Sequence, residues 1–159
     1  MSTGSMRNPM SDIVVIGGGA AGCMAALAAA GEGERVTLLE RNPKLGRKLY
    51  ITGKGRCNLT NACEPEVFFE NVVTNPRFMY SAFYGFTNRD MVAMVEQEGI
   101  PTKVERGNRV FPVSDHASDV TKALLARLKK LKVRLLTDTE VRGLLTESDR
   151  VTGVNVRGK

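Results

Sequence analysis

The sequence predicts an α/β fold of the Rossmann type, and two observations near the N-terminus predict it. An apolar run from Asp12 to Ile16 is followed by Gly17, Gly19 and Gly22, which fit the pattern G-x-G-x-x-G. An alanine-rich stretch comes next, and a second apolar run ends at the acid Glu40. Strand, glycine turn, helix, strand and terminal acid in this order indicate a βαβ unit that binds a dinucleotide.

Each glycine of the pattern has its own expected role. Gly17 allows the tight turn out of the strand, Gly19 lets the backbone approach a pyrophosphate, and Gly22 lets the helix pack closely on the sheet. The start of the helix then faces the phosphates, and its unpaired N–H groups and positive dipole end favour an anion. The competing interpretation is a purely structural turn, because many glycine-rich turns bind nothing.

The helix after the turn is expected over about Ala20 to Ala30, with Gly31 as its C-cap. The second strand follows over Arg35 to Leu39. Glu40 at its end is expected to accept hydrogen bonds from an adenosine ribose. A carboxylate there argues against a ribose 2′-phosphate, although the neighbouring Arg41 weakens that inference.

The segment from Asn42 to Ala62 is rich in Gly, Lys, Arg and Asn and has little apolar periodicity. A segment of this length without clear elements usually carries function. A helix is then expected from Thr87, where Thr87 and Asp90 resemble a capping box, to Gly99, which stops it.

The last third of the chain predicts two hairpins, a helix and a strand. The expected elements are a hairpin of Lys103 to Glu105 with Arg109 to Phe111, a helix from Ser118 to about Lys130, a strand over Val133 to Leu136, and a hairpin of Glu140 to Leu145 with Val151 to Val156.

Composition indicates one ordinary globular domain. The chain has 159 residues, of which 42% are hydrophobic and 25% charged. Residues 1–11 are expected to be a flexible extension before an ordered region over residues 12–159. The longest apolar run, Cys23 to Ala30, is too short for a membrane span, and no secretory signal precedes it. A cytoplasmic location without membrane contact is therefore expected.

The net charge of +6 raises the question of a nucleic-acid partner. The basic residues are spread along the chain without a known nucleic-acid motif. The densest group, Arg127 to Lys132, has leucines at helical spacing and is better explained as a solvated helix face. We therefore expect a small-molecule substrate and no nucleic-acid partner.

Two further motifs identify a family. The passage from Arg41 to Asn61 contains GRKLYITGKGRCNLTN, and residues 108–120 read NRVFPVSDHASDV. Together with GGGAAG, these closely resemble the BaiN/RdsA-type flavoproteins, which are aminoacetone oxidase-like NAD(P)/FAD-dependent enzymes. The resemblance implies a Rossmann-like FAD-binding domain of the glutathione-reductase type. It also implies a truncated, N-terminal portion, because family members are much longer and add a substrate domain and later strands.

The resemblance implies FAD as cofactor, with NAD(P)H as a possible electron donor. Departures from the family pattern at Asn108 and His116 affect no expected cofactor contact. The expected cofactor-binding residues are Gly17, Gly19, Ala21 and Gly22 at the pyrophosphate, Glu40 at the ribose, Arg41, Arg47 and Lys48 as cations, Thr52, Gly53, Gly55, Arg56 and Asn58 beside the flavin, and Val141 at the adenine.

Cys57 lies in the segment expected near the flavin, but its spacing to Cys63 is not that of a redox pair. A structural thiol is therefore favoured. His116, the only histidine, is better explained as a surface or hydrogen-bonding residue than as a general base. Neither residue is assigned to catalysis, and no metal site is expected.

These observations predict the FAD-binding portion of an NAD(P)/FAD-dependent oxidoreductase that works by flavin-mediated hydride transfer, with the substrate unassigned. Two alternatives stay open. One is a fragment of an NAD-dependent Rossmann dehydrogenase, which bound flavin would exclude. The other is a non-catalytic, truncated nucleotide-binding module.

Overall fold

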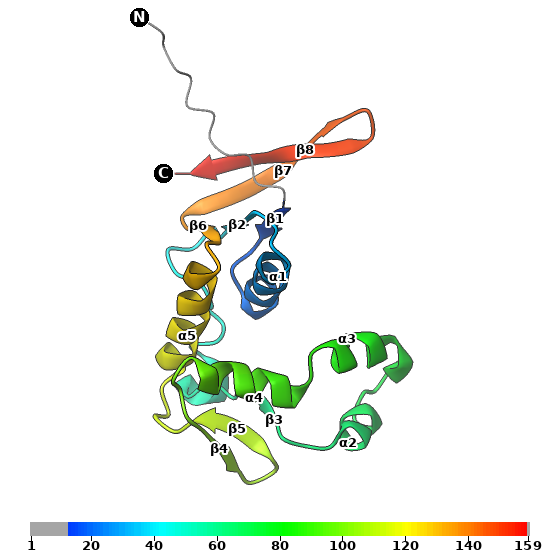
Figure 1. Ribbon diagram of the computed structural model, residues 1–159, viewed down its shortest axis with the longest axis vertical. Coiled ribbons are helices and arrows are strands. Elements are labelled where there is room, and N and C mark those ends of the chain that lie inside the picture. Colours follow the sequence, from blue (N-terminus) through cyan, green and yellow to red (C-terminus); the bar gives the residue numbers. More distant parts are fainter. Residues whose placement is uncertain (1–12, 159) are drawn as a thin grey trace, which may run out of the picture. The chain divides into compact units, whose positions relative to one another are not determined.

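The computed structural model describes residues 13–158 (Figure 1). These residues form two compact units, which are taken in turn below. The first contains residues 13–47 and 127–158, and the second contains residues 48–126. The extension expected over residues 1–11 lies outside the described residues.

The first unit contains a parallel sheet built from β1 (Ile13–Ile16), β2 (Val36–Leu39) and β6 (Arg134–Leu136), in the order β1-β2-β6. The helix α1 (Ala20–Gly31) connects β1 to β2. Two neighbouring parallel strands need such a crossover, and here the crossover is the helix. The predicted α/β fold with a βαβ unit is confirmed (Figure 1).

The end of α1 differs from the prediction. Gly31 is the last helical residue and does not act as a left-handed cap. Gly33 takes that conformation, with φ of +88°, and its N–H donates to the carbonyl of Ala30. The prediction that Gly31 caps the helix is therefore wrong, because the chain turns two residues later at the next glycine.

A long antiparallel hairpin of β7 (Thr139–Glu147) and β8 (Arg150–Gly158) completes the first unit. Its two-residue loop, Ser148 and Asp149, has positive φ at both positions, as a type I′ turn requires. The predicted hairpin is confirmed, and it extends beyond the predicted strands at both ends.

The second unit combines short helices with a small antiparallel sheet of order β3-β5-β4. Its elements are the 3₁₀ helix η1 (Thr52–Gly55), β3 (Thr60–Asn61), α2 (Pro65–Glu70), η2 (Pro76–Met79), α3 (Tyr80–Gly85), α4 (Asn88–Gln97), β4 (Thr102–Glu105), β5 (Arg109–Pro112) and the start of α5 (Ala117–Lys130).

The predicted elements of this unit are confirmed. The Thr87 side chain accepts a hydrogen bond from the Asp90 N–H, and the Asp90 carboxylate accepts one from the Thr87 N–H, so α4 begins with a complete capping box. The β4–β5 hairpin turns at Arg106 to Asn108, where Gly107 and Asn108 have positive φ. No helix within residues 13–158 has the length and apolar character to cross a membrane.

Candidate cofactor-binding site

The glycine turn after β1 has the geometry that its three predicted roles require. Gly17 has φ of +99°, which favours glycine, and its N–H donates to the Leu39 carbonyl at 2.8 Å. A Cβ on Gly22 would lie 1.8 Å from the Gly17 carbonyl oxygen, so only glycine allows the helix to start this close to the turn. A Cβ on Gly19, by contrast, would meet no atom within 4 Å. The backbone at Gly19 is therefore open to a ligand.

The start of α1 leaves donors for an anion. In any helix the first N–H groups have no intrahelical acceptor, and in α1 these belong to residues 19–22. The N-cap is Gly19, which has no side chain to satisfy them, and the first turn holds no acid. Ala21 is exposed beside them. A phosphate fits this donor set without competition from the chain.

Glu40, at the end of β2, is buried with 8% of its surface exposed, and it ties the strand to the glycine turn. One carboxylate oxygen accepts the Gly18 N–H at 2.7 Å. The other accepts the backbone N–H of Asn42 at 2.7 Å and its side-chain amide. Burial alone would raise the pKa of Glu40, but these hydrogen bonds outweigh it and hold the pKa below its ordinary value of 4.5.

The sequence motif does not single out Gly18, yet this residue is buried and closely packed. A Cβ there would lie 2.2 Å from Cδ2 of Leu45. Its carbonyl accepts the Gly46 N–H at 2.7 Å, so the loop after β2 packs directly on the turn. The available signal was the middle position of three consecutive glycines, which the G-x-G-x-x-G pattern ignores.

The other predicted residues of the first unit differ in their surroundings. Arg41 is exposed, and its charge contributes to the lowered pKa of Glu40. Arg47 is exposed and donates to the Asn42 side-chain oxygen at 3.3 Å. Val141 is half-buried on β7 and pairs with Val156. The start of β7 is fixed near Glu40, because the Thr139 N–H donates to the Glu40 carbonyl at 2.9 Å.

The predicted flavin segment, Thr52 to Asn58, lies in the second unit and is a succession of turns. Gly53 and Lys54 have left-handed backbones, with φ of +57° and +58°, and Gly55 has φ of +89°. A Cβ on Gly53 would lie 2.8 Å from Cε1 of Phe111 and 3.0 Å from the Asn58 nitrogen. Gly53 is therefore required both by its conformation and by its close neighbours. Lys48, Thr52 and Asn58 are exposed.

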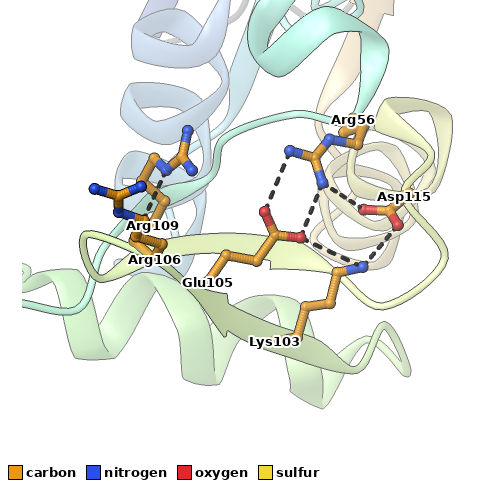
Figure 2. A network of polar contacts seen from close by, with 6 residues as sticks. All are labelled: Arg56, Lys103, Glu105, Arg106, Arg109 and Asp115. Carbon is orange, nitrogen blue, oxygen red and sulfur yellow. Dashed lines mark hydrogen bonds and ion pairs between the residues drawn. The ribbon is translucent and has the colours of Figure 1, made fainter.

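Arg56 is the centre of an ion-pair network in this unit (Figure 2). Its two terminal nitrogens lie 2.9 and 3.3 Å from the two carboxylate oxygens of Glu105, and one of them also lies 3.3 Å from Asp115. Lys103 donates to the other Asp115 oxygen at 2.6 Å and lies 3.6 Å from Glu105. The Arg56 guanidinium also stands 4.1 Å from the centre of the Phe111 ring.

The charges of this network stabilise one another. The hydrogen bond from Arg56 is the main cause that lowers the pKa of Glu105, and the bond from Lys103 does the same for Asp115. The reciprocal hydrogen bonds raise the pKa of Arg56 and of Lys103. All four groups therefore stay charged at neutral pH.

The thiols and the histidine do not form a reactive centre. Cys57 is fully buried, and burial raises the pKa of its thiol. Burial and the charge of Glu40 raise the pKa of Cys23 to about 11. Both thiols are therefore protonated and unreactive at neutral pH. His116 is exposed. Across residues 13–158, no group of three or more His, Cys, Asp or Glu side chains is placed to hold a metal ion.

The glycine turn, the open helix start and the buried acid define a Rossmann-like domain of the FAD-binding type. The model of the HI0933-like protein Rossmann domain matches residues 11–159, and the chain belongs to this family. The resemblance to BaiN/RdsA-type flavoproteins is thereby confirmed.

Two curated relatives support this assignment. The 3-dehydro-bile acid delta(4,6)-reductase of Clostridium scindens is 35% identical over 137 residues, covering 85% of this chain and 33% of the relative. The ribosomal RNA dihydrouridine synthase of Escherichia coli is 34% identical over 131 residues, covering 82% of this chain and 32% of the relative. The chain thus spans about a third of the length of the curated relatives that it matches.

A solved structure shares the fold. The crystal structure of Thermovibrio ammonificans THI4 superposes with a TM-score of 0.63 at 14% sequence identity. The match covers 93% of this chain and 48% of that one. The fold extends over nearly the whole chain.

Proposed function

We propose that this chain is the FAD-binding portion of an NAD(P)/FAD-dependent oxidoreductase that acts on a small molecule. The observation that carries the proposal is the contrast within the glycine turn. A Cβ at Gly22 would clash with the Gly17 carbonyl oxygen, whereas a Cβ at Gly19 would enter open space beside the unpaired donors of α1. Backbone is exposed where a pyrophosphate would approach, and the chain is closely packed where the helix must approach the sheet.

We propose that further residues of the chain would hold the rest of an adenine dinucleotide. An ionised carboxylate offers about four acceptor sites. Gly18 and Asn42 donate three hydrogen bonds to Glu40, which leaves capacity for a ribose hydroxyl. Arg41, Arg47 and Lys48 would supply cations, and Val141 would meet the adenine through its backbone. Bound FAD would supply the hydride chemistry, with NAD(P)H as electron donor.

The backbone of the 52–58 segment would face the flavin ring. In this proposal the backbone at Gly53 and Gly55 approaches the flavin closely. Thr52 and Asn58 supply polar contacts. The buried Cys57 takes no part in electron transfer, because its thiol is protonated at neutral pH. We further propose a cytoplasmic location, which the three free thiols of the chain support.

The substitution Gly19→Val tests the site. A side chain there would block the approach of the pyrophosphate, while its Cβ would meet no atom of the chain within 4 Å. We expect FAD binding, measured by flavin fluorescence titration, to be abolished, and the free energy of unfolding to change by less than about 1 kcal/mol. Gly31→Val is the matched control, because a Cβ at Gly31 also meets open space but lies at the far end of α1. Equal FAD affinity in Gly19→Val and wild type would contradict the proposed site.

A second candidate is an RNA substrate. The relatives from Escherichia coli and Haemophilus influenzae both carry the name ribosomal RNA dihydrouridine synthase, and this chain has a net charge of +6. Contacts to phosphates would make RNA association fall steeply with salt. Filter binding of ribosomal RNA between low and physiological salt separates the candidates, because the small-molecule proposal predicts no saturable binding.

A further inference from the structure

Left-handed backbone conformations gather around Arg56. Besides Gly53 and Gly55, the non-glycine residues Lys54, Cys57 and Asp115 have φ of +58°, +61° and +56°. L-residues adopt this conformation at an energetic cost. Such residues persist only where the surrounding structure holds them, and they concentrate at functional sites.

The holding contacts come from distant parts of the sequence. Arg56 is joined to Glu105, 49 residues away on β4, and to Asp115, 59 residues away before α5. Lys103 bridges the same two carboxylates (Figure 2). A bidentate guanidinium–carboxylate pair fixes orientation as well as distance. Arg56 therefore ties the 52–58 segment to two separate elements of its own unit.

Phe111 adds an aromatic contact to the support of the segment. It is 1% exposed, it lies beneath the Arg56 guanidinium, and its ring edge occupies the space that a Cβ on Gly53 would need. Cys57 is also buried, in a cluster with Ala117 and Val120. The 52–58 segment is thus held at three of its residues, Gly53, Arg56 and Cys57.

We propose that Arg56 is a positioning residue, which with Glu105, Asp115 and Lys103 holds the backbone of the 52–58 segment in one conformation. This assigns the guanidinium a role different from the direct flavin contact that the sequence predicts. Three of its hydrogen bonds go to carboxylates and its face covers Phe111. That this conformation serves the flavin rests on the proposed function.

The test measures amide hydrogen exchange of residues 53–58 in the full chain without FAD. Arg56→Lys keeps the charge but loses the planar fork and its stacking on Phe111. Glu105→Gln breaks the same ion pair by removing the negative charge of the partner of Arg56. We expect each variant to speed exchange in this segment about tenfold, because both release the same local structure. Arg89→Lys is the matched control, since the Arg89 guanidinium donates to the Glu64 carboxylate in the same unit and not to the carboxylates of the Arg56 network.

FAD titrations of the same variants separate positioning from contact. Positioning predicts that Arg56→Lys and Glu105→Gln weaken FAD binding by similar factors and that the double variant weakens it little further. Weaker FAD binding in Arg56→Lys alone, with wild-type exchange in both variants, would overturn the proposal. Faster exchange spread evenly over residues 48–126 would overturn it too, because it would indicate general loss of stability. A wild-type chain that leaves FAD unbound contradicts the proposed function, and the exchange rates then decide the positioning role by themselves.

Discussion

The glycine turn at residues 17–22 and the segment at residues 52–58 are both predicted cofactor contacts, but they are built by opposite means. The turn depends on missing side chains, since a Cβ at Gly18 or Gly22 would meet atoms 2.2 or 1.8 Å away. The segment depends on side chains that are present, above all Arg56 and Phe111. Local sequence thus specifies the first region, and contacts distant in sequence specify the second.

This difference predicts which changes each region tolerates. At Gly22 in the turn, an added methyl group meets the backbone of Gly17, which cannot move without displacing the end of β1. In the segment, an added methyl group at Gly53 meets the edge of the Phe111 ring and the backbone nitrogen of Asn58, which belongs to the same segment. A methyl group at Gly22 should therefore affect the fold itself, whereas the effect of a methyl group at Gly53 should remain local.

The largest expected effect is that of Gly22→Ala. Its Cβ would overlap the Gly17 carbonyl oxygen, so α1 must move away from β1. We expect a loss of at least about 3 kcal/mol in the free energy of unfolding, measured by urea denaturation. In the control, Gly31→Ala, the Cβ is unobstructed and the helix gains up to about 1 kcal/mol. Equal stability of the two variants would show that the turn is not closed as described.

An intermediate effect is expected for Gly53→Ala, which combines a left-handed backbone with a close neighbour. We expect a loss of about 1–3 kcal/mol in unfolding free energy. Gly107→Ala separates the two causes, since Gly107 has φ of +74° with no atom within 4 Å of its Cβ. Its loss should be only about 1 kcal/mol, the cost of the conformation. If both variants lose the same amount, packing against Phe111 contributes nothing.

The smallest expected effect concerns Glu40. Glu40→Gln should cost about 1–2 kcal/mol at pH 7, because an amide replaces a charged acceptor of two backbone N–H groups. The folded pKa lies below 4.5, so the stabilisation is present above pH 4.5 and is lost as the pH falls through the folded pKa. Denaturation at pH 7 and pH 3 should therefore show the gap to wild type closing at low pH. Glu34→Gln, an exposed site, should show no gap at either pH.

The sequence predicted the first unit well because its signals are local. The succession of apolar strand, glycine turn and alanine-rich helix is indicated by neighbouring residues alone. The loop Ser148–Asp149 is likewise a two-residue turn between two clear strands. The error at Gly31 arose because two glycines, Gly31 and Gly33, could each end the helix.

The second unit was predicted less completely, for two physical reasons. The helices α2 and α3 are too short to show a periodicity, and they are held by ring contacts such as the stack of Phe68 on Phe83. The partners of Arg56 lie 49 and 59 residues away, so no local pattern indicates them. The chemistry of the 52–58 segment was therefore predicted as a direct contact, and its support became visible only in three dimensions.

The most direct test of the central claim is the flavin content of the purified chain, measured by visible absorption before and after FAD is added and the excess removed. We expect one bound FAD per chain after reconstitution, and almost none in Gly19→Val. A folded wild-type chain that stays colourless after the same treatment would contradict it.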